Sequence, residues 1–167
     1  MIREATIEGP YRYELRRRWA DGPAVLFVGL NPSTADGDHD DPTVRRCIRF
    51  ASRLGCGELL IGNLYGWRAT DPRALRGVDD PVGPANDEHL VAMAGRSRYV
   101  LAAWGATEGP LMGRPWEVSR LLCEITSAVF CLGTTRYGHP RHPVRLRADA
   151  PLEVYLSDRR NHAEVLA

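Results

Sequence analysis

Four short apolar segments recur along the chain at a spacing that suits alternating strands and helices. Continuous apolar runs of this length are typical of strands buried on both faces, as in a parallel sheet. Each run stops at a glycine or at a polar residue followed by a turn. The four predicted strands cover residues 24–29, 58–65, 99–105 and 128–133.

Amphipathic segments lie between these runs and predict helices. The first has the clearest start, because Asp41 is a good N-cap residue and Pro42 suits the first turn. Its apolar positions Val44, Cys47 and Ala51 share one face, which we expect to pack on the sheet. Further helices are predicted over residues 86–96 and 115–125, with a short one over 72–76.

The ends of the chain carry weaker signals. Alternation of Tyr11, Tyr13 and Leu15 with polar residues predicts an edge strand, followed by a solvated arginine run at 16–18. The acidic stretch 34–41 lacks the spacing of a calcium loop, so we expect a lid or a lead-in to the following helix. Residues 151–167 are predicted to form a polar tail.

The alternation of strands and helices predicts an α/β fold: a three-layer sandwich with a central, mainly parallel four-stranded sheet. Residues 1–167 are expected to form a single domain with a core over about 10–150. The chain has no GxGxxG, GxxxxGK[ST] or GxSxG motif after its strands. This disfavours a dinucleotide, P-loop or α/β-hydrolase site.

Composition narrows the chemistry further. All 22 basic residues are arginine, which excludes lysine Schiff-base chemistry, and the formal net charge of +1 gives no global electrostatic case for nucleic acid. The four cysteines form no CxxC pair, so we expect free thiols in a reducing compartment and no metal site. With no leader or membrane-length apolar span, the expected location is cytoplasmic.

Polar or aromatic side chains mark the end of each predicted strand. Asn31 comes just after the first strand, Asn63 and Trp104 fall near the carboxyl ends of the second and third, and His139 and His142 follow the fourth. Loops at the carboxyl ends of parallel strands gather at one edge of a sheet, where ligands bind. Amides that offer both donor and acceptor groups suit the edge of a nucleobase, so a base-binding cleft is predicted.

These motifs resemble those of the uracil-DNA glycosylase superfamily. Gly29-Leu30-Asn31-Pro32-Ser33 is similar to its Gly-x-[Asp/Asn]-Pro motif, Asn63 to its base-reading asparagine, and Ala103-Trp104-Gly105 to its Trp-Gly strand end. The segment 139–143, His-Pro-Arg-His-Pro, resembles its final His-Pro-Ser-Pro motif with one inserted residue. Taken whole, residues 10–150 resemble a bacterial domain family of unknown function with a Leu-Asn-Pro-Ser-Thr-Ala signature.

The resemblance implies an N-glycosidase that needs no cofactor. Asn31 would position the attacking water, and either His139 or His142 would hydrogen-bond the departing base. The substrate would be a damaged or modified base in DNA, or a free nucleotide. The substrate-binding residues predicted from the motifs are Gly29, Pro32, Ser33, Asn63, Tyr65, Trp104 and Arg141.

A second interpretation remains open at this point. A non-catalytic module that binds a nucleobase or nucleic acid would use the same pocket without turnover. Near-neutral net charge favours a small substrate, whereas the arginine-rich stretches 45–53 and 136–147 favour DNA.

Overall fold

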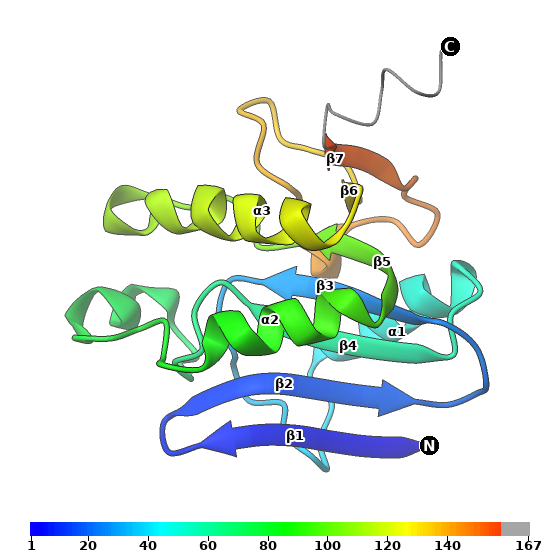
Figure 1. The fold of residues 1–167 in the computed structure, drawn as a ribbon, viewed down its shortest axis with the longest axis horizontal. Coiled ribbons are helices and arrows are strands. Elements are labelled where there is room, and N and C mark those ends of the chain that lie inside the picture. Colours follow the sequence, from blue (N-terminus) through cyan, green and yellow to red (C-terminus); the bar gives the residue numbers. More distant parts are fainter. Residues whose placement is uncertain (158–167) are drawn as a thin grey trace.

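The computed structural model describes residues 1–157 and contains one mixed seven-stranded sheet with helices on both faces (Figure 1). The α/β class is as predicted, but the sheet is larger than the expected four strands. Its order is β1-β2-β4-β3-β5-β6-β7. The strands are β1 (Ile2–Glu8), β2 (Tyr11–Arg18), β3 (Ala24–Gly29), β4 (Glu58–Asn63), β5 (Ser97–Ala102), β6 (Ala128–Cys131) and β7 (Glu153–Ser157).

The four predicted strands form the parallel centre of this sheet, in the order β4-β3-β5-β6. In their register, Gly29 pairs with Asn63 and Val28 pairs with Ala102. The carboxyl ends of β3, β4 and β5 therefore lie side by side, which positions the loops that follow them. Antiparallel strands extend the sheet on both sides of this centre.

The prediction that residues 11–15 form an edge strand was wrong in its position. These residues begin β2, which lies between β1 and β4 and hydrogen-bonds both. The edge is β1, whose residues are mostly exposed and whose polar side chains gave no strand signal. On the opposite edge, β7 lies within the expected tail, and residues 158–167 of that tail lie outside the described part of the chain.

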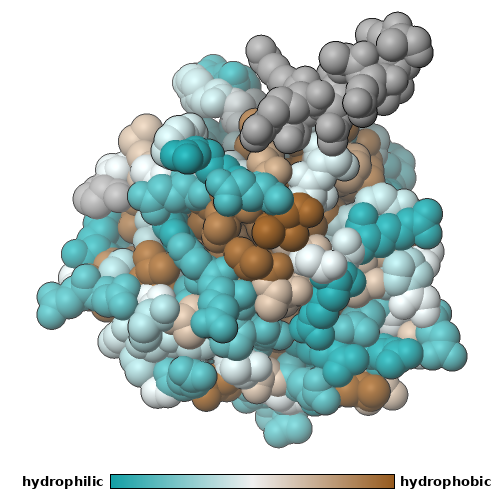
Figure 2. All heavy atoms as spheres, in the orientation of Figure 1, coloured by the Kyte–Doolittle hydropathy of each residue, from teal (hydrophilic) through white to brown (hydrophobic). Residues whose placement is uncertain are grey.

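The helices complete three layers around two apolar clusters. Leu26 and Val28 of β3 pack toward α2 and α3, whereas Val25 and Phe27 pack toward α1 on the other face. Figure 1 shows α2 and α3 in front of the sheet and α1 behind it, and Figure 2 shows a hydrophobic patch among hydrophilic side chains on the front face. The helices are α1 (Pro42–Arg53), α2 (Asn86–Gly95) and α3 (Gly113–Ile125), with 3-10 turns η1 (Pro72–Gly77), η2 (Gly109–Leu111) and η3 (Pro143–Arg145).

The start of α1 confirms its predicted cap. The Asp41 carboxylate accepts a hydrogen bond from the Val44 amide at 2.8 Å, and Pro42 occupies the first turn. This satisfies one of the amide groups that a helix N-terminus leaves without a partner. The cap fixes Asp41 at the end of the acidic loop, next to the strand ends.

Arg17 corrects the expectation that the arginine run is solvated. Its side chain is fully buried and pairs with Asp40 at 2.7 Å. The same guanidinium donates to the backbone carbonyls of Asp36 and His39. Arg17 thus ties the acidic loop to β2, and this loop leads directly into α1. Within residues 1–157, no helix is long and apolar enough to cross a membrane.

We expect Arg17→Met to destabilise the protein by about 3 kcal/mol, because removing one partner of a buried ion pair leaves the other charge unpaired. Asp40 is only 10% exposed in its side chain and would keep just the half-exposed Arg3 as partner. Urea denaturation measures the difference. The matched control is Arg18→Met on the same strand, where the Asp21 partner is fully exposed and the loss should stay below about 1 kcal/mol. Equal losses in both variants would contradict the anchoring role of Arg17.

Candidate functional site

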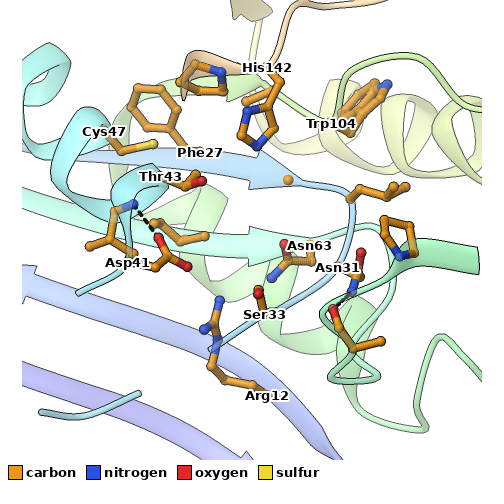
Figure 3. A pocket seen from close by; sticks show the side chains of 18 of the residues that line it. Arg12, Phe27, Asn31, Ser33, Asp41, Thr43, Cys47, Asn63, Trp104 and His142 are labelled. Carbon is orange, nitrogen blue, oxygen red and sulfur yellow. Dashed lines mark hydrogen bonds between the residues drawn. The ribbon is translucent and has the colours of Figure 1, made fainter. Parts of the chain in front are cut away.

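A cavity of about 230 Å³ opens at the carboxyl ends of β3, β4 and β5 (Figure 3). One wall is apolar and comes from the sheet and the first turns of α1. The other walls carry polar side chains from the strand-end loops, from β2 and from the loop before η3. The apolar wall includes Phe27, Val44, Cys47, Ile61 and Ala103, and the polar side chains are Arg12, Asn31, Ser33, Asp41, Thr43, Asn63, Thr70 and His142.

Asn63 is held at the floor of this cavity by its neighbour Gly29. The two residues are paired across the parallel ladder, and a Cβ on Gly29 would lie 2.8 Å from the Asn63 Oδ1 atom. The glycine therefore makes room for the amide. Asn63 is only 3% exposed, and its Nδ2 has no hydrogen-bond partner among the described residues. A buried donor without an acceptor is costly, so it is available to a ligand.

Asn31 is oriented by the loops around it. Its Nδ2 donates to the carbonyl of Ala69 at 2.8 Å and to that of Pro32 at 3.1 Å. The segment is further fixed because the Ala69 amide donates to the Pro32 carbonyl at 3.0 Å. These bonds use the amide's donor side, so within residues 1–157 the Oδ1 acceptor of this cavity-lining residue stays unengaged.

Arg12 brings a positive charge into the cavity from β2. The residue is 3% exposed, and its guanidinium donates to the Ala35 carbonyl, while its Nε has no partner among the described residues. Burial lowers the pKa of Arg12 to about 10, an effect that the carboxylate of Asp41 partly offsets. The side chain therefore remains cationic at neutral pH. No carboxylate within residues 1–157 forms an ion pair with it.

Two polar side chains enter the cavity from the start of α1. Asp41 uses one carboxylate oxygen to cap the helix, which leaves the other oxygen as an acceptor in the cavity. Thr43 adds a hydroxyl group from the first turn. In Figure 3, Asp41 and Asn63 lie on either side of the Arg12 guanidinium.

His142 closes the cavity on the side opposite Arg12 (Figure 3). Its Nδ1 accepts a hydrogen bond from the Val144 amide at 3.3 Å, which leaves a neutral ring with its proton on Nε2. Burial lowers the pKa of His142, an effect that the carboxylate of Asp41 partly offsets and that Arg145 reinforces. His142 is therefore a neutral hydrogen-bond donor at pH 7.

The structure brings together one predicted residue from the carboxyl end of each of the four parallel strands or from the loop that follows it. Asn31, Asn63, Trp104 and His142 all line the same cavity. Trp104 is 2% exposed and packs edge-on against Tyr155, so its ring belongs mainly to the core. Gly29 and Ser33 also line the cavity.

Four other predicted residues do not line the cavity, and each has a structural role instead. Pro32 is buried, and its carbonyl accepts a hydrogen bond from the Ala69 amide. Tyr65 is a core residue whose hydroxyl donates to the Leu111 carbonyl at 3.3 Å. The remaining two are His139, in the turn bridged by Thr134 and Pro140, and Arg141, which is exposed and donates to the Thr134 carbonyl at 3.1 Å.

Sequence reasoning missed several polar and apolar lining residues. Arg12 was not singled out, because it is one of the polar residues that alternate with Tyr11, Tyr13 and Leu15 in the predicted edge strand. Asp41 was recognised as a helix cap, and its capping role could have signalled that it faces the strand ends. Phe27 and Cys47 were assigned to the core, and in the structure they form the part of the core that lines the cavity.

The site offers little to a metal ion. No group of three or more histidine, cysteine or acidic side chains within residues 1–157 could hold one. The cysteines form no disulfide in this part of the chain. Burial strongly raises the pKa of the Cys47 thiol, so it remains protonated and is a poor nucleophile.

Comparison with known proteins places the chain in a family. A family model described as "Protein of unknown function (DUF1643)" matches residues 12–144. The chain belongs to this family. The matched region contains every cavity-lining residue named above. No curated protein and no solved structure matches the chain.

We expect the stability of the protein to fall as the pH drops below about 6.5, the ordinary pKa of histidine, with His142 contributing to the loss. Since the pKa of His142 is lowered in the folded state, the unfolded chain takes up its proton more readily, and acid favours unfolding. The free energy of unfolding measured from pH 5 to 8 tests this. His142→Gln should flatten the profile in the acid range. A profile for His142→Gln that is as steep as that of the wild-type protein would contradict the assignment.

Proposed function

We propose that this protein is an N-glycosidase that hydrolyses a base–sugar bond in DNA or in a nucleotide. The observation that carries the proposal is the convergence of Asn31, Asn63 and His142 on one small cavity. A volume of about 230 Å³ lies below the range of about 300–1,000 Å³ usual for larger ligands. It suits a single heterocyclic ring whose sugar remains at the mouth.

Each polar group has a task that hydrolysis requires. Water must form a bond to the anomeric carbon while the base–sugar bond breaks and leaves its electron pair on the base. The free Oδ1 of Asn31 would hold that water, and the buried Nδ2 of Asn63 would bind the base edge. His142, neutral and donating through Nε2, would hydrogen-bond an oxygen of the base.

The resemblance to uracil-DNA glycosylases supports the same function. It rests on the four strand-end motifs, and three of these motifs contribute an amide or imidazole side chain to the cavity. The central parallel order β4-β3-β5-β6 is compatible with the three-layer fold that the resemblance implies. The substrate class follows from the resemblance and the cavity together, as a proposal.

A binding module without turnover is the second candidate. One observation favours it: the group that would position water is an amide, which cannot accept a proton from that water. The carboxylate of Asp41 lies in the same cavity and could take this proton in an enzyme. Turnover therefore decides between the two candidates.

We expect Asn31→Ala to lower the rate of base release by about 10²–10³-fold while leaving ligand affinity nearly unchanged. The assay offers oligonucleotides that contain deoxyuridine, hypoxanthine or other modified bases, in parallel with the corresponding free nucleotides, and measures the released base. The matched control is Asn86→Ala, which removes a buried amide that donates to the Asn63 and Leu64 carbonyls but does not line the cavity.

Absence of base release from every substrate by the wild-type protein would contradict the enzyme and favour the binding module. An equal fall in rate for both variants, accompanied by an equal loss of thermal stability, would indicate a structural role for Asn31.

A further inference from the structure

Arg12 stands apart from the motif residues of the cavity. It lies on β2, an antiparallel strand that contributes none of the strand-end loops, yet its side chain reaches the cavity floor beside Asn63 (Figure 3). Nearby Arg17 is fully engaged by Asp40. The side chain of Arg12 has only the Ala35 carbonyl as a hydrogen-bond partner in the described part of the chain.

This arrangement is unfavourable for the Arg12 side chain. A buried guanidinium without a carboxylate partner costs free energy, and its unpartnered Nε adds to that cost. The surrounding charges compensate incompletely, since Asp41 and Asp36 attract the cation while Arg68 and Arg17 repel it. A negatively charged oxygen of a ligand would remove the deficit.

A second buried hydrogen-bond donor in the cavity also lacks an acceptor. The Nδ2 of Asn63 is buried and unpartnered, and it lines the same cavity from the neighbouring strand β4. Two strands thus present hydrogen-bond donors, one of them charged, to one small space. Charge-assisted hydrogen bonds of this kind are roughly twice as strong as neutral ones.

We infer that Arg12 binds the base in its anionic form, as the counter-charge to an exocyclic oxygen of the leaving base. This inference rests on the proposed function and deepens it. When the base–sugar bond breaks, its electron pair stays on the ring nitrogen, and the charge spreads to an oxygen conjugated with that nitrogen. Arg12 stabilises this charge until the base takes up the proton that the attacking water releases. Neutral His142 can donate a hydrogen bond but supplies no charge.

The substrate class follows from this role. A base with an oxygen on the edge that enters the cavity can share its negative charge with Arg12. A base that presents only an amino group there would set donor against donor. The site therefore selects oxo-substituted heterocycles.

The test is calorimetric binding of 5-fluorouracil between pH 6 and 9. This probe loses a ring proton more readily than uracil because fluorine withdraws electrons, and Arg12, with a pKa of about 10, stays charged over the range. Affinity of the wild-type protein should rise as the probe becomes anionic. Arg12→Gln should weaken binding of the anion by about 10- to 100-fold and abolish the rise, and Arg12→Lys should retain it. Arg18→Gln, on the same strand and half-exposed, is the matched control.

A rise of affinity with pH in Arg12→Gln that equals the wild type would overturn the inference, and so would failure of the wild-type protein to bind the probe at any pH. Thermal unfolding of each variant identifies any that does not fold. If Arg12→Gln does not fold, the comparison of Arg12→Lys with the wild-type protein tests the inference. Binding that depends on Arg12 without base release from any substrate would refute the glycosidase and keep the anion site. Base release together with pH-independent binding would keep the glycosidase and refute the anion site.

Discussion

The parallel register between β3 and β4 is the constraint on which the site depends. It sets Gly29 beside Asn63, and the ladder continues past the strands because the amides of Leu64 and Tyr65 donate to the carbonyls of Gly29 and Leu30 at 2.9 and 3.0 Å. The two segments that follow β3 and β4 therefore leave the sheet together and remain hydrogen-bonded to each other. A side chain at position 29 would collide with the amide of Asn63, so backbone pairing and amide placement are satisfied together only with glycine.

Strand β2 supports this site although it lies outside the parallel centre. Arg17 anchors the acidic loop through Asp40 and two backbone carbonyls, and Arg12 reaches the carbonyl of Ala35 in the same loop. The two arginines differ in their electrostatics, because Arg17 has a carboxylate partner and Arg12 has none within the described residues. One arginine thus stabilises the wall of the cavity, and the other remains available inside it.

The sequence predicted the central elements well and the periphery poorly. Continuous apolar runs identified β3, β4, β5 and β6, and the Asp41-Pro42 pair identified the start of α1. The edge strands were missed because β1 and β7 are largely exposed and lack the long apolar runs of the central strands. Such strands are ordered by hydrogen bonds to their neighbours in the sheet, which leave no pattern in the local sequence.

The residues of the candidate site also fall into those that the sequence predicted and those that only the structure placed. The sequence by itself determined which loops follow the buried strands, and hence that Asn31, Asn63 and a histidine near 140 would approach one edge of the sheet. Only the tertiary structure decided that His142 and not His139 lines the cavity, and that Arg12 lies inside it. Both outcomes depend on contacts between residues far apart in the chain, namely the pairing of β2 with β4 and the path of the loop before η3. Side-chain periodicity reports which face of a strand is buried, but it does not report which distant residues share the space above it.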